Sequence, residues 1–264
     1  MTDPHTTSGV ETAPEAGRLK LRHRLQVFLR SFAIQGSWNE RTMQGGGFGY
    51  ALLPGLQALY PDDPDELDRA VRRHVEHFNA HPYLADLALG AVLRLEADGV
   101  PVEEIRRFKS AVRGPLGSLG DVLVWAGWLP ACTLLALALA LMGLGPWLTI
   151  LVFLVLYNLG HVILRAWVFR AGFREGREVG RWLRGAHLSR YSSAVAAAGS
   201  LLLGVVVGLG VSRGVVGAGI PWPMAVVASL LLAAGTLRGL ELRRPAWLIF
   251  LSVTFILLLW GVLA

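Results

Sequence analysis

The stretch Lys109–Trp128 reads KSAVRGPLGSLGDVLVWAGW and marks the place where a charged segment meets the first long apolar run of the chain. It holds three glycines at three-residue spacing, a helix-breaking Pro115 and one carboxylate, Asp121. A carboxylate inside a bilayer costs about 3 kcal/mol or more unless it is paired or faces a cavity, so we expect a functional role for Asp121. In the alternative interpretation, Gly114-Pro115 only forms the turn into a membrane helix, and Asp121 caps that helix, because Asp is a favoured cap.

Composition identifies a membrane protein. Of the 264 residues, 53% are hydrophobic, and the apolar content is concentrated after Leu116. The 25 Lys and Arg residues outnumber the 19 acidic residues, but the arginines cluster at the edges of apolar runs. That distribution is typical of the positive-inside rule and not of a nucleic-acid surface. The single cysteine, Cys132, excludes an internal disulfide framework or a paired-cysteine metal site.

Apolar runs predict an all-α, polytopic fold with about five spans. The runs cover approximately residues 122–144, 147–167, 194–212, 222–237 and 246–263. Seven arginines lie between Arg165 and Arg190, whereas the neighbouring loops carry almost no charge. Arg238, Arg243 and Arg244 form a second arginine-rich loop before the last run. This alternation predicts that the amino terminus and both arginine-rich loops are cytoplasmic and that the carboxyl terminus lies outside.

We expect three regions along the chain. Residues 1–17 are polar and predict a disordered tail without the apolar core of a signal peptide. Residues 18–113 predict amphipathic and re-entrant helices, of which the first, at 18–31, is basic and suits either the membrane surface or a partner subunit. Residues 114–264 form the transmembrane helical region.

Two local patterns suggest sites that we do not favour. The glycine cluster 45–49 lacks the Lys and Ser or Thr of a phosphate loop, so we expect a mobile or re-entrant turn there. His74, His77 and His81 have helical spacing on a predicted helix at 65–80, but no further ligand converges on them. We therefore predict no metal site and no cofactor.

The sequence resembles the IID subunit of mannose/fructose/sorbose-type phosphotransferase system (PTS) sugar permeases. The resemblance covers residues 25–180 well and is carried by Gln35-Gly36-Ser37-Trp38-Asn39, Met43-Gln44, Gly47-Phe48, Pro54, Leu59-Tyr60-Pro61, Arg73-His74-Val75-Glu76-His77-Phe78-Asn79, Pro82, Leu89-Gly90, Leu95-Glu96, Lys109, Gly114-Pro115-Leu116, Gly120-Asp121 and Trp125. Asn158, Arg165, Gly172, Gly176 and Pro245 extend it more thinly.

Three departures from the family pattern are visible. The Glu40-Arg41 pair is shifted by one place relative to the Asn-x-Glu-Arg-Met-Gln pattern of the family. Val122 stands where the family often has Pro or Ser, and the loop 211–222 is much shorter than usual. Contacts that these positions make in relatives are therefore not carried over to this chain.

The resemblance implies a membrane subunit that is not itself phosphorylated and has no catalytic residue of its own. Such a subunit acts with a IIC membrane subunit and soluble IIA and IIB phosphocarriers, in a hetero-oligomer of the cytoplasmic (inner) membrane, to take up a hexose-type sugar and phosphorylate it. No nucleic acid is expected as a partner. The residues that we expect to bind substrate or to lie at a subunit interface are Asn39, Gln44, His74, Asn79, Asp121 and Trp125.

Two other functions are compatible with parts of the sequence. A membrane scaffold or regulatory protein that has lost transport would show similar departures from the family pattern. An intramembrane serine protease would use the glycine-flanked Ser118 with His161, provided that the two side chains reach hydrogen-bond distance.

Overall fold

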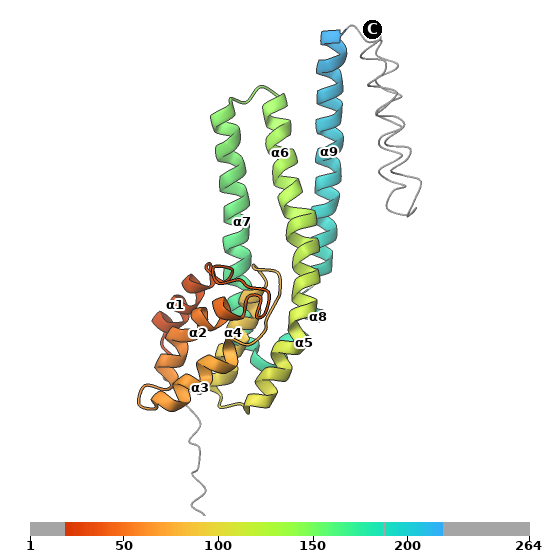
Figure 1. The fold of residues 1–264 in the computed structure, drawn as a ribbon. Helices are drawn as coiled ribbons and strands as arrows, with labels where there is room; N and C mark the ends of the chain where they lie inside the picture. The colour runs from red at the N-terminus through yellow and green to blue at the C-terminus, as the bar shows by residue number, and fades with distance from the viewer. Residues whose placement is uncertain (1–18, 187, 219–264) are drawn as a thin grey trace, which may run out of the picture. The chain divides into compact units, whose positions relative to one another are not determined.

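The computed structural model describes residues 19–186 and 188–218. These residues form helices joined by loops, with two isolated β-bridges (Figure 1). The helices are α1 (Leu21–Ser31), α2 (Gly45–Leu59), α3 (Pro64–His74), α4 (Ala85–Ala97), α5 (Val102–Gly120), η2 (Asp121–Trp128), α6 (Leu129–Leu141), α7 (Pro146–Glu175), η3 (Gly176–Glu178), α8 (Val179–Gly185) and α9 (Leu188–Ala218). The all-α prediction is confirmed for this part of the chain. The predicted tail 1–17 and the apolar runs 222–237 and 246–263 lie outside the described residues.

The described residues divide into two compact units. The first unit comprises residues 19–127 and 157–193, and the second comprises residues 128–156 and 194–218. The first unit is therefore discontinuous in sequence, because the chain leaves it at the end of η2 and returns to it within α7.

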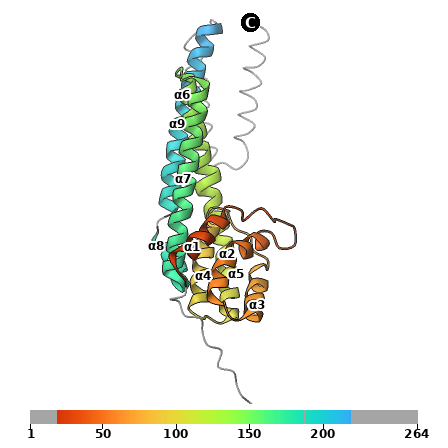
Figure 2. The same ribbon diagram turned by 90° about the vertical axis from the view of Figure 1, so that its left-hand side faces the viewer.

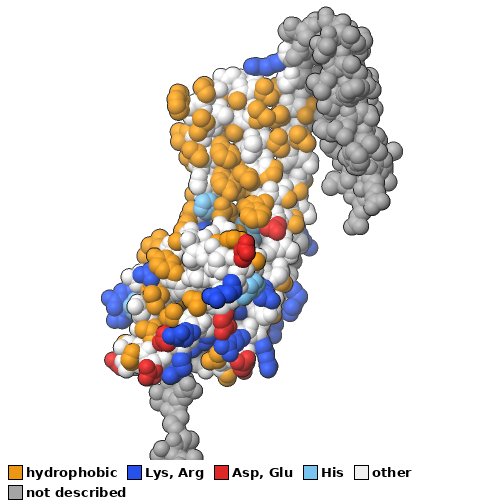
Figure 3. Space-filling view, in the orientation of Figure 1, with side chains coloured by type: hydrophobic (Ala, Val, Ile, Leu, Met, Phe, Trp, Pro, Cys, Tyr) orange, Lys and Arg blue, Asp and Glu red, His pale blue; other side chains and the backbone are white. Residues whose placement is uncertain are grey.

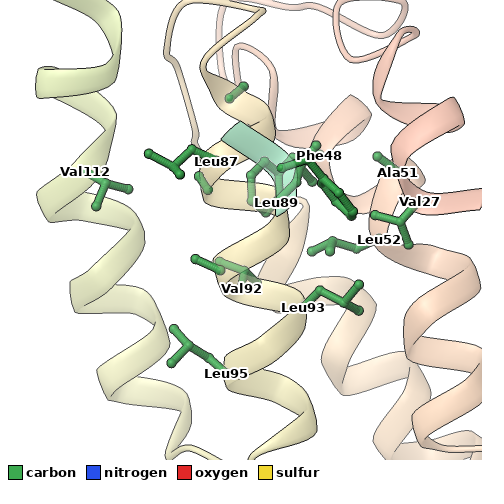
Figure 4. Close-up of a cluster of buried hydrophobic side chains, with 14 of the residues drawn as sticks. Val27, Phe48, Ala51, Leu52, Leu87, Leu89, Val92, Leu93, Leu95 and Val112 are labelled. Carbon is green, nitrogen blue, oxygen red and sulfur yellow. The ribbon is translucent and has the colours of Figure 1, made fainter. Parts of the chain in front are cut away.

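The core of the first unit is centred on α4. Every residue of this helix except Arg94 is buried, whereas α1 and α5 contribute one side each (Figure 4). Phe48 and Leu52 of α2 and Leu87 and Leu93 of α4 are completely buried, and Val27 of α1 closes the cluster. At about 1.5–3 kcal/mol for each buried large apolar side chain, this cluster is the main stabilising term of the unit. Figure 2 shows α1, α2 and α4 side by side.

Glycines of α2 permit close backbone contact and do not form the turn that we predicted at 45–49. A Cβ on Gly47 would overlap the carbonyl of Ile34, and one on Gly45 would overlap the carbonyls of Val75 and Glu76. The glycines lie at the start of helix α2. They allow its backbone to contact Ile34, which precedes the helix, and Val75 and Glu76, which follow it. The predicted mobile turn is wrong, because small residues in a tightly packed helix give the same local signal as a flexible loop.

Helix α3 is shorter than predicted. Asp63 caps its amino terminus by accepting a 2.8 Å hydrogen bond from the Glu66 amide, and Pro64 occupies the first turn, where its missing N–H costs nothing. The helix ends at His74, so that His77 and His81 do not continue one helical face.

The opening stretch forms one continuous helix from Val102 to Leu141. Pro115 lies inside α5 and does not break it, and Asp121 lies at the junction of α5 and η2, within the continuous helix and not at an amino-terminal cap. The interpretation of Gly114-Pro115 as a turn before a capped helix is therefore wrong. The eight residues Asp121–Trp128 are wound as a π-helix, a form that is rare and frequently found at functional sites.

Three helices within the described residues are long and apolar enough to cross a membrane. They are Val102–Leu141, Pro146–Gly185 and Arg190–Gly210, and they overlap the first three predicted runs. Figure 3 shows apolar side chains over α6 and the amino-terminal half of α7, while Lys, Arg, Asp and Glu gather over the first unit. The chain is thus a helical membrane protein with a charged helical bundle.

Candidate functional site

Five of the six residues that we predicted to be functional lie around the connection between α3 and α4, whereas His74 lies in a separate cluster. We call residues 78–83, which read Phe-Asn-Ala-His-Pro-Tyr, the connecting segment. One side of it is fixed to the loop 39–44 and the other side packs on η2 and α7.

Gln44 fixes the connecting segment with both groups of its buried side-chain amide. Its Nε2 donates to the carbonyl of Ala80 at 2.8 Å, and its Oε1 accepts from the Ala80 amide at 3.1 Å. The backbone adds two bonds, from the Gln44 amide to the Phe78 carbonyl at 2.9 Å and from the Phe78 amide to the Thr42 carbonyl at 3.2 Å. The Gln44 side chain thus uses both its N–H donor and its oxygen acceptor to hold the backbone of Ala80.

Asn39 shapes the loop that carries Gln44. Its Oδ1 accepts hydrogen bonds from the amides of Arg41 and Thr42 at 3.1 and 2.9 Å, and its Nδ2 donates to the Thr42 hydroxyl at 2.8 Å. This turn presents an exposed Trp38 and places Met43 at a φ of 53°, which is uncommon for a residue other than glycine. Backbone strain of this kind is concentrated at functional sites.

His81 lies on the other side of the connecting segment, against η2. Its ring contacts the Trp125 ring with centroids 4.8 Å apart and an interplanar angle of 60°. A Cβ on Gly120 would overlap the His81 side chain, so only glycine permits this approach. The imidazole is buried, its Nδ1 accepts a 3.2 Å hydrogen bond from the Tyr83 amide, and its Nε2 has no partner within the described residues.

Burial lowers the pKa of His81 to about 4, against the opposing attraction of the Asp121 carboxylate. The imidazole is therefore neutral at physiological pH, and because its Nδ1 accepts from Tyr83, its Nε2 carries the hydrogen and offers an N–H donor. Asp121 itself is exposed, as is about half of the Trp125 side chain.

Tyr83 continues the cluster to α7. Its ring stacks on His161 with centroids 4.7 Å apart and an interplanar angle of 20°, and its hydroxyl lies 2.8 Å from the hydroxyl of Tyr157. The guanidinium of Arg165 lies 5.7 Å from the Tyr83 ring centroid and is held by Asp86 at 2.6 Å. A row of contacting aromatic and imidazole side chains therefore extends from Trp125 of η2 to His161 of α7.

His74 belongs to a different cluster, inside the first unit. Its Nε2 lies 2.7 Å from the carboxylate of Glu96, which also accepts bonds from Arg73 at 2.8 and 2.7 Å and from the Tyr60 hydroxyl at 2.9 Å. Burial would raise the pKa of Glu96, but the bonds from Arg73 and His74 lower it to about 2. Burial also lowers the pKa of His74. This network joins α2, α3 and α4 and is enclosed by protein.

The structure thus separates the six predicted site residues into three groups. Asn39, Gln44 and the exposed Asn79 lie around the first half of the connecting segment, Asp121 and Trp125 lie beside its second half, and His74 is enclosed elsewhere. Sequence reasoning missed His81 and Tyr83 as members of the site. The available signal was the His81-Pro82 pair, whose proline lies among the residues that carry the family resemblance.

Other chemistries find no support in the described residues. No group of three or more His, Cys, Asp or Glu side chains there is arranged to hold a metal ion. The Ser118 hydroxyl donates to the Pro115 carbonyl at 3.3 Å, and His161 packs on Tyr83 and Tyr157, so that no Ser118–His161 hydrogen bond is formed. An exposed indole, a free carboxylate and a neutral imidazole suit binding of a neutral polar ligand better than bond cleavage.

Comparisons with known proteins agree on one family. The family profile described as "PTS system mannose/fructose/sorbose family IID component" matches residues 18–217. The chain is 33% identical to the PTS system mannose-specific EIID component of Escherichia coli K12, over 69% of this chain and 65% of that protein. It is 30% identical to the sorbose-specific EIID component of Klebsiella pneumoniae, over 69% and 68%. It therefore spans about two thirds of the length of these relatives.

Solved structures show a similar fold. A cryo-EM structure of the mannose transporter ManYZ in complex with microcin E492 matches with a TM-score of 0.57 and 31% identity, over 72% of this chain and 70% of that chain. A second match, described as a membrane protein, has a TM-score of 0.64, the same identity and the same coverage.

Proposed function

Because the chain belongs to the IID-component family of the mannose, fructose and sorbose phosphotransferase systems, we propose that it is the IID subunit of a mannose-type system. In this proposal it acts with a IIC membrane subunit, and soluble IIA and IIB proteins phosphorylate a hexose-type sugar as it enters. The observation that carries the proposal is the match of residues 18–217, which includes the connecting segment and η2. The chain itself supplies binding and shape, and catalysis belongs to its partners.

We further propose a place for the sugar contacts. Asp121 is exposed on η2, one π-helical turn from the exposed Trp125, and the buried His81 packs on that indole. Carboxylates accept hydrogen bonds from hydroxyl groups, and aromatic faces pack on the apolar C–H faces of a ring. In this proposal Gln44 and Asn39 position the connecting segment, and Asn79 lies at the sugar site or at the IIC interface.

The proposed topology has five spans in the cytoplasmic membrane. The amino terminus and the segment near Gly185 face the cytoplasm, and the carboxyl terminus lies outside. Support comes from the arginines at 165–190 and from three described apolar helices. The amino-terminal helices contact the bilayer through amphipathic and re-entrant segments, in keeping with the exposed Leu21, Leu25 and Leu29 of α1.

Co-expression tests the function directly. The chain is produced with the IIC subunit encoded in the same genome, and sugar-dependent phosphorylation is measured in membrane vesicles supplied with the IIA and IIB proteins. We expect phosphorylation only when both membrane subunits are present. Equal phosphorylation by IIC alone would contradict the proposal and favour a scaffold.

A further inference from the structure

Helices α1 and α7 run antiparallel along a row of contacting side chains, and at each end of the row an arginine of one helix covers a phenylalanine of the other. Phe32, Phe28 and Arg24 follow at four-residue spacing on α1 and meet Arg165, Phe169 and Phe173 of α7 in that order. The phenyl rings of Phe28 and Phe169 lie 5.7 Å apart in the middle. At each end a guanidinium lies 4.1 Å from the centroid of a phenyl ring of the other helix.

The two ends differ in what neutralises the guanidinium. Arg165 is almost fully buried and donates to the Asp86 carboxylate at 2.6 Å and to the Ser31 hydroxyl at 3.0 Å. Arg24, in contrast, has no carboxylate partner within the described residues, and its buried Nε has no hydrogen-bond acceptor there. A charged, buried donor without a partner costs more free energy than a paired one.

A second arginine adds to this unpaired charge. Arg170 lies one helical turn before Phe173, the ring that Arg24 covers, and its side chain is exposed. Side chains three residues apart on a helix are neighbours, so Arg170 lies close to the Arg24 guanidinium that covers Phe173. In keeping with this, burial lowers the pKa of Arg24, and repulsion by Arg170 lowers it further. The next three arginines on the chain are each paired with a carboxylate: Arg174 with Glu175, Arg177 with Glu104 and Arg181 with Glu178.

We propose that Arg24 and Arg170 form a binding site for a phosphoryl group at the end of the α1/α7 contact row. Guanidinium groups bind phosphate oxygens through paired N–H donors, and Arg24 is already oriented by its stacking on Phe173. The phosphoryl group belongs to an anionic phospholipid headgroup or to a soluble phosphate. The exposed Leu21 and Leu25 beside Arg24 favour the lipid, because they offer an apolar surface to its acyl chains.

Position along α7 also favours a phosphoryl group. Arg170 follows the apolar run 147–167 by three residues, which corresponds to the depth of lipid headgroups when that run spans the hydrocarbon layer. The site is independent of sugar transport, and it is tested by binding alone.

The test uses the full-length protein, purified in detergent with its co-purifying membrane subunit. Its thermal unfolding is measured during titration with short-chain phosphatidylglycerol, short-chain phosphatidylcholine and inorganic phosphate. Arg170→Gln is the main variant, because Arg170 is exposed and its replacement leaves the packing of α1 on α7 unchanged. Arg184→Gln removes an equal, exposed charge from the same arginine-rich segment and is the matched control.

We expect phosphatidylglycerol to bind the wild type and Arg184→Gln equally well and to bind Arg170→Gln about tenfold more weakly, since a charge-assisted bond contributes about one factor of ten. Phosphatidylcholine should bind all three proteins alike. If inorganic phosphate shows the same tenfold difference, the phosphoryl group need not come from lipid. Equal affinity of Arg170→Gln and wild type for both anionic ligands would overturn the proposal.

Arg24→Lys provides a second measurement. Lysine keeps the charge but loses the planar stack and the paired donors, so we expect a three- to tenfold loss of affinity for the anionic ligand without loss of the folded protein. Unchanged affinity in this variant would show that Arg24 does not contact the phosphoryl group.

Discussion

The Nε atom of Arg165 in α7 lies 2.6 Å from Oδ2 of Asp86 in α4, although the two residues are 79 positions apart in sequence. Both side chains are buried, and Arg165 also stacks on Phe32 and bonds to Ser31 of α1. One ion pair therefore ties a membrane helix to two helices of the amino-terminal bundle.

Breaking this pair should destabilise the first unit strongly. Asp86→Asn leaves the buried Arg165 charge without its carboxylate, and we expect the free energy of unfolding to fall by about 3–5 kcal/mol. Asp98→Asn breaks the exposed pair with Arg94 and should cost about 1 kcal/mol or less. Thermal unfolding of the purified protein measures both. A small effect of Asp86→Asn, similar to that of Asp98→Asn, would show that the pair is dispensable.

Close contact between α4 and α7 predicts intolerance of alanine at two glycines. A Cβ on Gly90 would overlap the Phe169 carbonyl, and one on Gly172 would overlap the Leu87 carbonyl. Because the overlap is with backbone atoms, which cannot rotate away as a side chain can, Gly172→Ala should lower the free energy of unfolding by about 1–3 kcal/mol or more. Gly180→Ala in α8 meets no neighbouring atom and should be neutral or stabilising by up to about 1 kcal/mol. Equal thermal stability of the two variants would refute the contact.

Acidic pH should weaken the packing of the connecting segment through His81. The pKa of this buried imidazole is lowered to about 4 in the folded state, from about 6.5 in an unfolded chain. The folded state therefore binds fewer protons, and its stabilisation is complete above about pH 6.5 and is lost as the pH falls through about 4. Unfolding of the wild type and of His81→Gln is compared between pH 7 and pH 4. We expect the wild type to lose more stability than the variant, and parallel pH profiles would contradict this.

Asp121→Asn distinguishes a sugar contact from a structural role. If the Asp121 carboxylate accepts hydrogen bonds from sugar hydroxyls, Asn replaces a charged acceptor with a mixed donor and acceptor, and uptake should fall tenfold or more. Membrane abundance and association with the IIC subunit should stay near wild type, because the side chain is exposed. Uptake within twofold of wild type at equal abundance would remove Asp121 from the site.

The sequence predicted the helical class and the three apolar runs that lie within the described residues, because apolar runs are local signals. It failed where one residue type serves two purposes. Pro115 predicts a helix break, yet it lies inside α5, and the glycines at 45–49 predict a turn, yet they begin α2. Gly120, like these glycines, permits a close contact, in this case with His81. Glycine is found both in closely packed helices and in flexible turns, so the residue type alone does not distinguish the two.

The pairings of the site could not be predicted from spacing. Gln44 bonds to Ala80 over 36 positions, and Tyr83 meets Tyr157 over 74, and no periodicity connects such distant residues. The predicted histidine face is absent because α3 ends at His74, and His77 and His81 lie in the non-helical chain between α3 and α4.

The discontinuity of the first unit constrains the order of events during synthesis. Ser31 of α1 leaves the ribosome 134 residues before Arg165, to which it bonds. At about 5–20 residues per second, α1 waits about 7–27 seconds for its α7 partner. During that interval residues 128–156 emerge, so the contacts of α1 with α7 can form only after this apolar hairpin has been made. Ribosome stalling or truncation before residue 165 therefore leaves a nascent chain whose α1 exposes Phe28, Phe32 and Ser31 to chaperones.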